Sequence, residues 1–88
     1  MKLTQTVKVK NDLGLHTRPA MTIVKLLQST PCDVHFTYKK ETVSAKSIMS
    51  ILMLAAQKNS SIKITIEGAN ADNLMGTLVN AFESRFGE

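Results

Sequence analysis

The 88-residue chain is poor in several residue types that define structural classes: it has one cysteine, two prolines, four glycines and no tryptophan. The lone Cys32 cannot close an internal disulfide, so a disulfide scaffold and a self-contained zinc finger are excluded. No apolar run reaches the ~18 residues that a membrane-spanning helix requires, and residues 1–6 lack the apolar block of a signal peptide. The length also excludes a multidomain enzyme. We therefore expect one cytoplasmic domain over residues 1–88, without a metal, a cofactor or membrane insertion.

Positive charge, by contrast, is in excess. The net charge is +4, and the imbalance lies in the first part of the chain. Residues 1–50 contain eight Lys or Arg and three acidic residues, whereas residues 51–88 contain three Lys or Arg and four acidic residues. A basic half favours an acidic partner, and charge alone leaves nucleic acid, an anionic membrane and an acidic protein surface open.

Alternation of apolar and polar residues predicts four β-strands. They are expected at residues 3–9, 32–38, 42–44 and 62–67, and each presents one apolar face. The polar residues 39–41 separate the second strand from the third, and so short a break indicates a tight hairpin.

Apolar residues at the spacing i, i+3, i+4, i+7 or i, i+4 predict three helices. The first begins at about Thr17 and ends before Ser29, and the second begins near Ser47. The third follows a turn at residues 68–70 and is expected to end at Gly87. The three apolar stripes comprise Ala20, Ile23, Val24 and Leu27; Ile48, Ile51, Leu52 and Ala55; and Leu74, Leu78, Phe82 and Phe86.

The resulting order is β-α-β-β-α-β-α, and every element has one apolar face. Two layers bury all of these faces economically. We therefore predict an α+β fold of the two-layer, open-faced β-sandwich type, in which a four-stranded, mainly antiparallel sheet is covered on one face by three helices.

Residues 14–20 (GLHTRPA) place a histidine where a strand gives way to a helix. A helix N-terminus attracts anions through its unpaired N–H groups and its dipole, and it disfavours a charged imidazole. Arg18 adds a fixed positive charge with donors suited to phosphoryl oxygens. His16 and Arg18 are therefore candidates for accepting a phosphoryl group. For an isolated histidine at a helix start, the commoner interpretation is a variant N-cap beside an exposed arginine.

This segment resembles the active-site motif of the HPr family, the histidine-containing phosphocarriers of the bacterial phosphoenolpyruvate-dependent sugar phosphotransferase system. A second block, residues 43–49 (VSAKSIM), together with the length and the element order, is similar to the family as well. The resemblance implies that enzyme I phosphorylates His16 on its pros nitrogen, that sugar-specific IIA domains receive the phosphoryl group, and that Arg18 neutralises the phosphate. It implies a stoichiometric carrier rather than an enzyme. It also implies that Ser47 is the serine that an HPr kinase/phosphorylase modifies in many bacteria.

Ser47 also has a plain structural interpretation, because serine at a helix start is a common N-cap. A phosphate there is expected to leave the helix intact and to repel an acidic partner. Met49 and Met53 lie one turn apart, where they either widen the core face or form a pliable docking patch. The resemblance favours docking and implies a partner surface around the starts of the first two helices. The residues expected in this surface are Thr17, Lys46, Ile48, Met49 and Met53.

Other chemistry-bearing residues give weaker signals. Cys32 and His35 lie three apart in a strand and so face opposite sides of the sheet, which argues against a metal site. Asp12 could orient His16, although a loop aspartate is more often a turn former. Glu88 is assigned no role.

Three functions compete for this sequence. The leading hypothesis is a monomeric phosphocarrier whose partners are enzyme I, IIA domains and, where the host has one, an HPr kinase/phosphorylase. The alternative in the same fold is a regulatory paralogue, either a nitrogen-branch carrier or a phosphoserine-dependent corepressor; a paralogue without carrier function should lack the histidine. A nucleic-acid-binding module is disfavoured because the chain has only four aromatic residues and neither an RNP string nor a GxxG loop.

Overall fold

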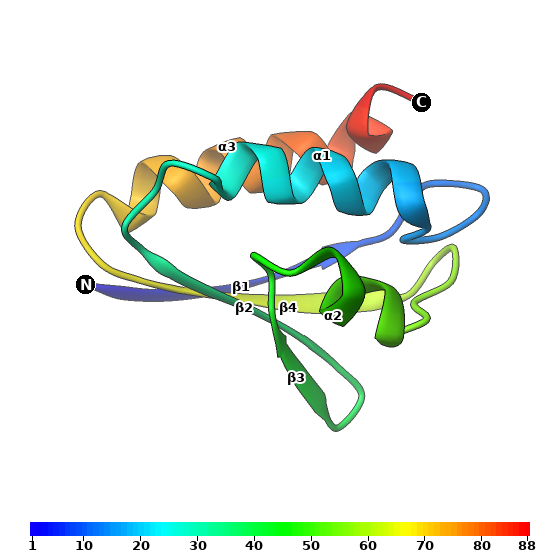
Figure 1. Cartoon of the computed structure of the whole chain (residues 1–88), viewed down its shortest axis with the longest axis horizontal. Helices are drawn as coiled ribbons and strands as arrows, with labels where there is room; N and C mark the ends of the chain where they lie inside the picture. Colours follow the sequence, from blue (N-terminus) through cyan, green and yellow to red (C-terminus); the bar gives the residue numbers. More distant parts are fainter.

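The computed structural model describes residues 1–88 and has two layers, a four-stranded sheet and three helices (Figure 1). The elements, in chain order, are β1 (Lys2–Lys8), α1 (Thr17–Leu27), β2 (Asp33–Tyr38), β3 (Glu41–Ser44), α2 (Ile48–Met53), β4 (Ser61–Glu67), α3 (Ala71–Glu83) and a short 3-10 helix, η1 (Arg85–Gly87). The predicted order of strands and helices is confirmed. No helix is both long enough and apolar enough to cross a membrane.

The sheet has the strand order β1-β4-β2-β3, and all neighbouring strands are antiparallel. The central strand β4 shows why the alternation was informative. Ile62, Ile64 and Ile66 are fully buried, whereas Ser61 and Lys63 are exposed. A shift of one residue in the pairing would move the isoleucines to the solvent face, so burial fixes the register.

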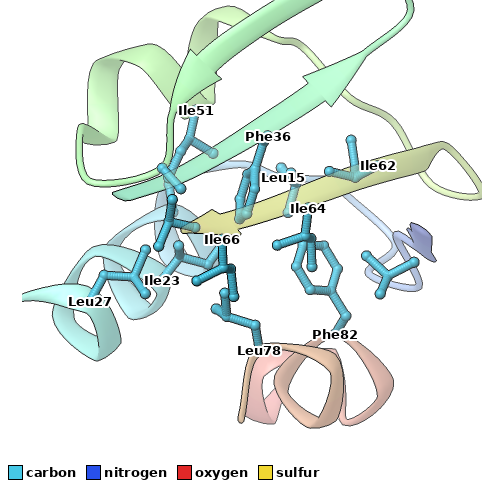
Figure 2. Packing of buried hydrophobic residues seen from close by; sticks show 14 of the residues in the cluster. Leu15, Ile23, Leu27, Phe36, Ile51, Ile62, Ile64, Ile66, Leu78 and Phe82 are labelled. Carbon is cyan, nitrogen blue, oxygen red and sulfur yellow. The ribbon is translucent and has the colours of Figure 1, made fainter. Parts of the chain in front are cut away.

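The apolar core lies between the buried face of the sheet and the helices (Figure 2). Phe36 of β2 and Phe82 of α3 meet edge to face, with their ring centroids 5.8 Å apart. Ile23 and Leu27, on the predicted stripe of α1, are fully buried in the same cluster. The core therefore holds α1 and α3 on one face of the sheet, and the other face is left open.

α1 and α2 pack against each other in opposite directions (Figure 1). The N–H of Leu15, just before α1, donates to the carbonyl of Ala56, just after α2, at 2.9 Å. At the other end, Lys46 Nζ donates to the carbonyl of Thr30, beyond the end of α1, at 2.9 Å. The start of α1 therefore lies beside the end of α2, and the start of α2 lies beside the end of α1.

Two helix ends differ from the prediction. The third helix was expected to reach Gly87, but α3 ends at Glu83, and Arg85 and Phe86 have φ values of 57° and 53°. Phe86 still reaches Phe82, with ring centroids 4.8 Å apart, so the apolar spacing is satisfied by a left-handed turn instead of a further helical turn. The apolar stripe predicted for the second helix was also one residue too long. It included Ala55, but α2 ends at Met53, and Ala55 is exposed with a φ of 51°.

Two glycines give a matched test of this backbone. Gly76 lies inside α3, and an added Cβ would meet no atom within 4 Å. Gly76→Ala is therefore expected to stabilise the fold by about 1 kcal/mol and to raise Tm by about 5 °C, because alanine is the better helix former. At Gly14, φ is +71° and a Cβ would lie 2.3 Å from the carbonyl oxygen of Ala56, so Gly14→Ala is expected to destabilise by about 2 kcal/mol or more. Thermal melts of both variants check this, and shifts of the same sign would contradict it.

Candidate functional site

The loop between β1 and α1 is anchored immediately before His16. Gly14 adopts a left-handed conformation against the backbone of Ala56, and its N–H donates to the carbonyl of Asn11 at 3.0 Å. Leu15 is buried and donates its N–H to the carbonyl of Ala56. This anchoring delivers His16 to the start of α1 at a defined position.

His16 occupies the N-cap position of α1 without capping the helix. Its backbone is extended, with φ −83° and ψ −166°, and its side chain makes no capping hydrogen bond. His16 is thus the N-cap by position, as the commoner interpretation has it, but its ring does not cap the helix. The N–H groups of Thr17 and Arg18 have no backbone partner, and the first turn contains no acidic residue. The start of α1 thus keeps the open donors that suit an anion.

The imidazole of His16 is half-buried, with 30% of its side-chain surface exposed, and it lies between two hollows. The hollow along α1 has a volume of about 480 Å³ and is also lined by Thr17, Arg18, Met21, Thr22 and Lys25. The hollow on the other side has a volume of about 400 Å³ and is also lined by Asn11, Asp12, Leu13, Arg85 and Glu88. The first hollow contains two cations and no acid, so it suits an anionic group; the second contains charges of both signs.

Arg18 is exposed at the edge of the first hollow, as its place off the apolar stripe predicted. It takes part in none of the three salt bridges of the structure. Its guanidinium is therefore available to an incoming anion, and no intramolecular ion pair must first be broken.

Glu88, to which the sequence analysis gave no role, contacts His16. Its carboxylate oxygens lie 3.1 and 3.2 Å from Nε2 of the imidazole. The side-chain amide of Asn11 also donates a hydrogen bond to this carboxylate. Partial burial raises the pKa of Glu88, but the hydrogen bonds with Asn11 and His16 and the positive charge of Arg18 outweigh it, so the pKa lies below its ordinary value.

Asp12 does not orient His16. Its carboxylate accepts a hydrogen bond from Lys58 Nζ at 2.8 Å. The hydrogen bond and the charge of Lys58 lower the pKa of Asp12 below its ordinary value. Asp12 therefore links the loop before α1 to the turn before β4, and Glu88 is the acidic residue beside the imidazole of His16.

Ser47 is the N-cap residue of α2, as predicted. Its hydroxyl accepts a hydrogen bond from the N–H of Ser50 at 3.2 Å. Met49 and Met53 are 69% and 76% exposed, which contradicts the interpretation that they widen the core face. Thr17, Lys46 and Ile48, the other residues of the expected docking surface, are exposed too.

The residues expected around the starts of α1 and α2 do not gather at one point, because α1 and α2 pack antiparallel. Ser47 and Lys46 lie beside the end of α1, because Lys46 reaches Thr30. An α1 of 11 residues separates that end from His16 by roughly 15 Å. The predicted residues therefore form a strip along both helices, with Met53 at the end of α2, towards the start of α1. We call this strip the α1–α2 surface; it also includes the exposed Met21 and Lys25.

Cys32 and His35 lie on opposite faces of the sheet, which confirms the prediction from their spacing. Cys32 is buried and its Sγ donates to the carbonyl of Ala69 at 3.2 Å, whereas His35 is exposed on the open face. His35 therefore provides a solvent-facing histidine remote from α1, with which His16 can be compared.

Four residues around His16 were missed by the sequence analysis: Asn11, Leu13, Arg85 and Glu88. Arg85 and Glu88 lie about 70 residues away along the chain and approach only because the turn after α3 is left-handed. No local pattern could have revealed them. Leu13, 77% exposed in the loop before the motif, did carry a signal, since an apolar residue in so polar a loop has no place in the core.

The sequence and the fold of this chain are similar to those of known proteins. The family described as PTS HPr component phosphorylation site matches residues 3–84 of the chain. A phosphocarrier protein HPr from Chlamydia pneumoniae is 49% identical over 87 residues, which cover 99% of this chain and 81% of that protein. A phosphocarrier protein NPr from Klebsiella oxytoca is 33% identical over 89 residues, with 100% and 99% covered.

The solved structures agree with this likeness. A crystal structure of HPr from Thermoanaerobacter tengcongensis has a TM-score of 0.92 to this chain at 32% identity. The match covers 98% of this chain and 97% of the other. The predicted open-faced α+β fold is therefore confirmed both by the observed elements and by a solved structure of the same architecture.

Proposed function

This chain belongs to the HPr family of phosphocarrier proteins of the phosphotransferase system, and from this premise we propose that His16 carries the phosphoryl group. The carrier accepts it from enzyme I and passes it to sugar-specific IIA domains. The observation that carries the proposal is the position of His16, half-exposed beside the open N–H groups of α1 and next to a free guanidinium. Nucleophile, anion donors and cation all come from one chain, so one copy suffices.

The chemistry asks little of the protein beyond positioning and charge neutralisation. A phosphoryl group transferred in line between two nitrogens spreads its charge over its equatorial oxygens. The N–H groups of Thr17 and Arg18 and the guanidinium of Arg18 can bind those oxygens without rearranging, which is the main advantage of a preorganised site. The hollow along α1 leaves room for the group between the carrier and its partner.

The α1–α2 surface is the surface that we assign to the partners. Its methionines are exposed, unbranched and polarizable, so they can adapt to several different partner surfaces. Its basic residues include Arg18, Lys25 and Lys46, and no acidic residue occurs between positions 13 and 32. Partners with an acidic rim are therefore favoured. We further propose that phosphorylation of Ser47 regulates this docking.

A nitrogen-branch carrier is the second candidate function, and the names of some relatives support it. Proteins named NPr are among the relatives, at 33% and 32% identity. The 49% identity to a protein named HPr favours the sugar branch. Both branches require the same histidine chemistry, so the donor and acceptor proteins distinguish them.

The test is phosphorylation of the purified chain with phosphoenolpyruvate and enzyme I. We expect one acid-labile phosphoryl group, lost in His16→Ala and retained in His35→Ala, which removes the exposed histidine of the opposite sheet face. Parallel reactions with sugar-branch and nitrogen-branch donor proteins assign the branch by the faster rate. Labelling that survives in His16→Ala, or that disappears in His35→Ala, would contradict the proposal.

A further inference from the structure

Methionine is the commonest large apolar residue on the exterior of this protein. Seven large apolar side chains are exposed, and four of them are methionines. Met21, Met49 and Met53 are 55%, 69% and 76% exposed, and all three belong to the α1–α2 surface. The remaining exposed apolar side chain of that surface is Ile48, at 37%. The apolar area that a partner meets there is therefore mostly thioether.

The other two of the five methionines lie elsewhere. Met1 is 68% exposed, and its carbonyl accepts a hydrogen bond from the N–H of Gly68. Met1 precedes β1 and His16 follows it, so the length of the strand separates them. Met75 of α3 is 5% exposed and belongs to the apolar core. The chain thus contains exposed methionines on the docking surface, one exposed methionine away from it and one buried methionine.

We propose that Met21, Met49 and Met53 form a reversible oxidation site, at which oxygen transfer from a peroxide to the thioether sulfur weakens partner docking. The inference rests on the proposed function, because the α1–α2 surface is the surface that we assign to the phosphotransfer partners. It adds control by oxidation to control by charge at Ser47.

The oxidation is a two-electron step in which a peroxide is the co-reactant. A lone pair of Sδ attacks one peroxide oxygen, an S–O bond forms, and the O–O bond breaks. With hydrogen peroxide, the departing hydroxide takes up the proton of the transferred oxygen and leaves as water. The sulfur is oxidised to the sulfoxide and the peroxide is reduced. Methionine sulfoxide reductases reverse the change: a dithiol is oxidised to a disulfide, and the sulfoxide oxygen leaves as water.

The sulfoxide loses the properties that suit methionine to docking. The thioether side chain is apolar and pliable, whereas the sulfoxide has a polar oxygen and a chiral sulfur. Burying that oxygen in an apolar contact costs free energy unless the partner supplies a hydrogen bond. Met49 and Met53 lie one helical turn apart, so both sulfoxides would face the same part of a partner. Met21 also lines the hollow along α1, next to His16.

The fold should tolerate this oxidation. None of the three methionines of the α1–α2 surface belongs to the core cluster, so their oxidation leaves the packed interior unchanged. Met75 is shielded by burial. Cys32 is shielded too, because it is 1% exposed and its Sγ donates to the carbonyl of Ala69. A peroxide should therefore reach the docking surface before it reaches any sulfur in the interior.

The test begins with mild treatment of the purified full chain with hydrogen peroxide. Peptide mass spectrometry should find added oxygen at the exposed methionines before Met75, and the parent Tm should be retained. With the oxidised carrier as the varied substrate of enzyme I, KM should rise about tenfold, roughly the effect of losing one strong contact residue. The value of kcat should stay within twofold of the parent. Repair with methionine sulfoxide reductase and dithiothreitol should restore the parent KM.

Two triple variants separate oxidation from other effects of peroxide. The combination of Met21→Leu, Met49→Leu and Met53→Leu keeps apolar side chains of similar size that peroxide does not oxidise, so KM should stay near the parent value before and after treatment. This variant retains Met1 and Cys32, and it therefore reports any effect of oxidation elsewhere. Glutamine at the same three positions is polar and unbranched, like the sulfoxide, and should raise KM without any peroxide.

The proposal is overturned if the oxidised carrier keeps the parent KM, or if treatment raises the KM of the triple leucine variant as much as that of the parent. It is also overturned if Met75 is oxidised as fast as the methionines of the α1–α2 surface, or if the reductase leaves the raised KM unchanged. An untreated parent protein that accepts no phosphoryl group from enzyme I would refute the proposed function, and oxidative control of docking would fall with it.

Discussion

Replacing Arg18 by alanine is expected to slow phosphoryl transfer through His16 about a hundredfold and to leave the fold intact. The rate should fall because one preorganised donor beside the developing charge is worth about two to three orders of magnitude in comparable sites. Stability should change by less than about 0.5 kcal/mol, because Arg18 is exposed and forms no salt bridge. The measurement is the rate of acceptance from enzyme I, with a thermal melt of each variant.

Two variants isolate the cause of this effect. Lys25→Ala removes another cation of the same hollow, two turns further along α1, and should reduce the rate far less because it lies away from the ring. Arg18→Lys restores the charge without the planar fork of donors, so it should recover only part of the rate. The loss of the Arg18 guanidinium should lower kcat, since its interaction with the phosphoryl group forms in the transition state. A mutant with the parent rate, or one with a lowered Tm, would defeat the assignment.

The parts of the fold that could be predicted are those in which burial acts on neighbouring residues. In β4, isoleucines at every second position can be buried only as a strand with one face inward, and they are. The end of α3 could not be predicted in this way. Phe82 and Phe86 have helical spacing, but their rings also meet across a left-handed turn, so the pattern does not distinguish the two backbones.

The residues of the candidate site likewise fall into those that local sequence predicts and those that it does not. His16, Arg18 and the open start of α1 are local features, and the motif alone located them. Glu88 depends on a turn that the sequence did not reveal, and the contact between Glu88 and His16 joins residues 72 positions apart. The relative direction of α1 and α2 was also beyond reach, because periodicity says which face of a helix is buried but not which way the helix runs.

The antiparallel packing of α1 and α2 determines which step a modification of Ser47 can affect. Ser47 lies at the end of the α1–α2 surface opposite His16, roughly 15 Å away along α1. This exceeds the Debye length of about 8 Å at physiological salt, so charge at Ser47 should not perturb the reacting atoms directly. It should act on partner docking. We therefore expect Ser47→Asp to raise the KM for the carrier and to leave kcat unchanged, the opposite of Arg18→Ala.

The expected size follows from the charges. An exposed charge pair is worth up to about 1 kcal/mol, so one added negative charge facing an acidic partner should raise KM about fivefold. Phosphoserine, with nearly two charges, should raise it roughly 25-fold. Both effects should shrink as salt is added. The measurement is the enzyme I reaction with the carrier as the varied substrate, at low and high ionic strength.

Substitutions of Ser47 should affect stability and docking independently, because the Ser47 hydroxyl caps α2 by accepting a hydrogen bond from the N–H of Ser50. Aspartate is as good an N-cap as serine, so Ser47→Asp should keep the parent Tm and lose affinity. Alanine cannot cap, so Ser47→Ala should lose about 1 kcal/mol, or about 5 °C, and keep the parent KM. Ser61→Asp adds the same charge at an exposed position in β4 and controls for net charge alone. If Ser61→Asp raised KM as much as Ser47→Asp, the effect would be one of net charge, and docking at the start of α2 would be ruled out.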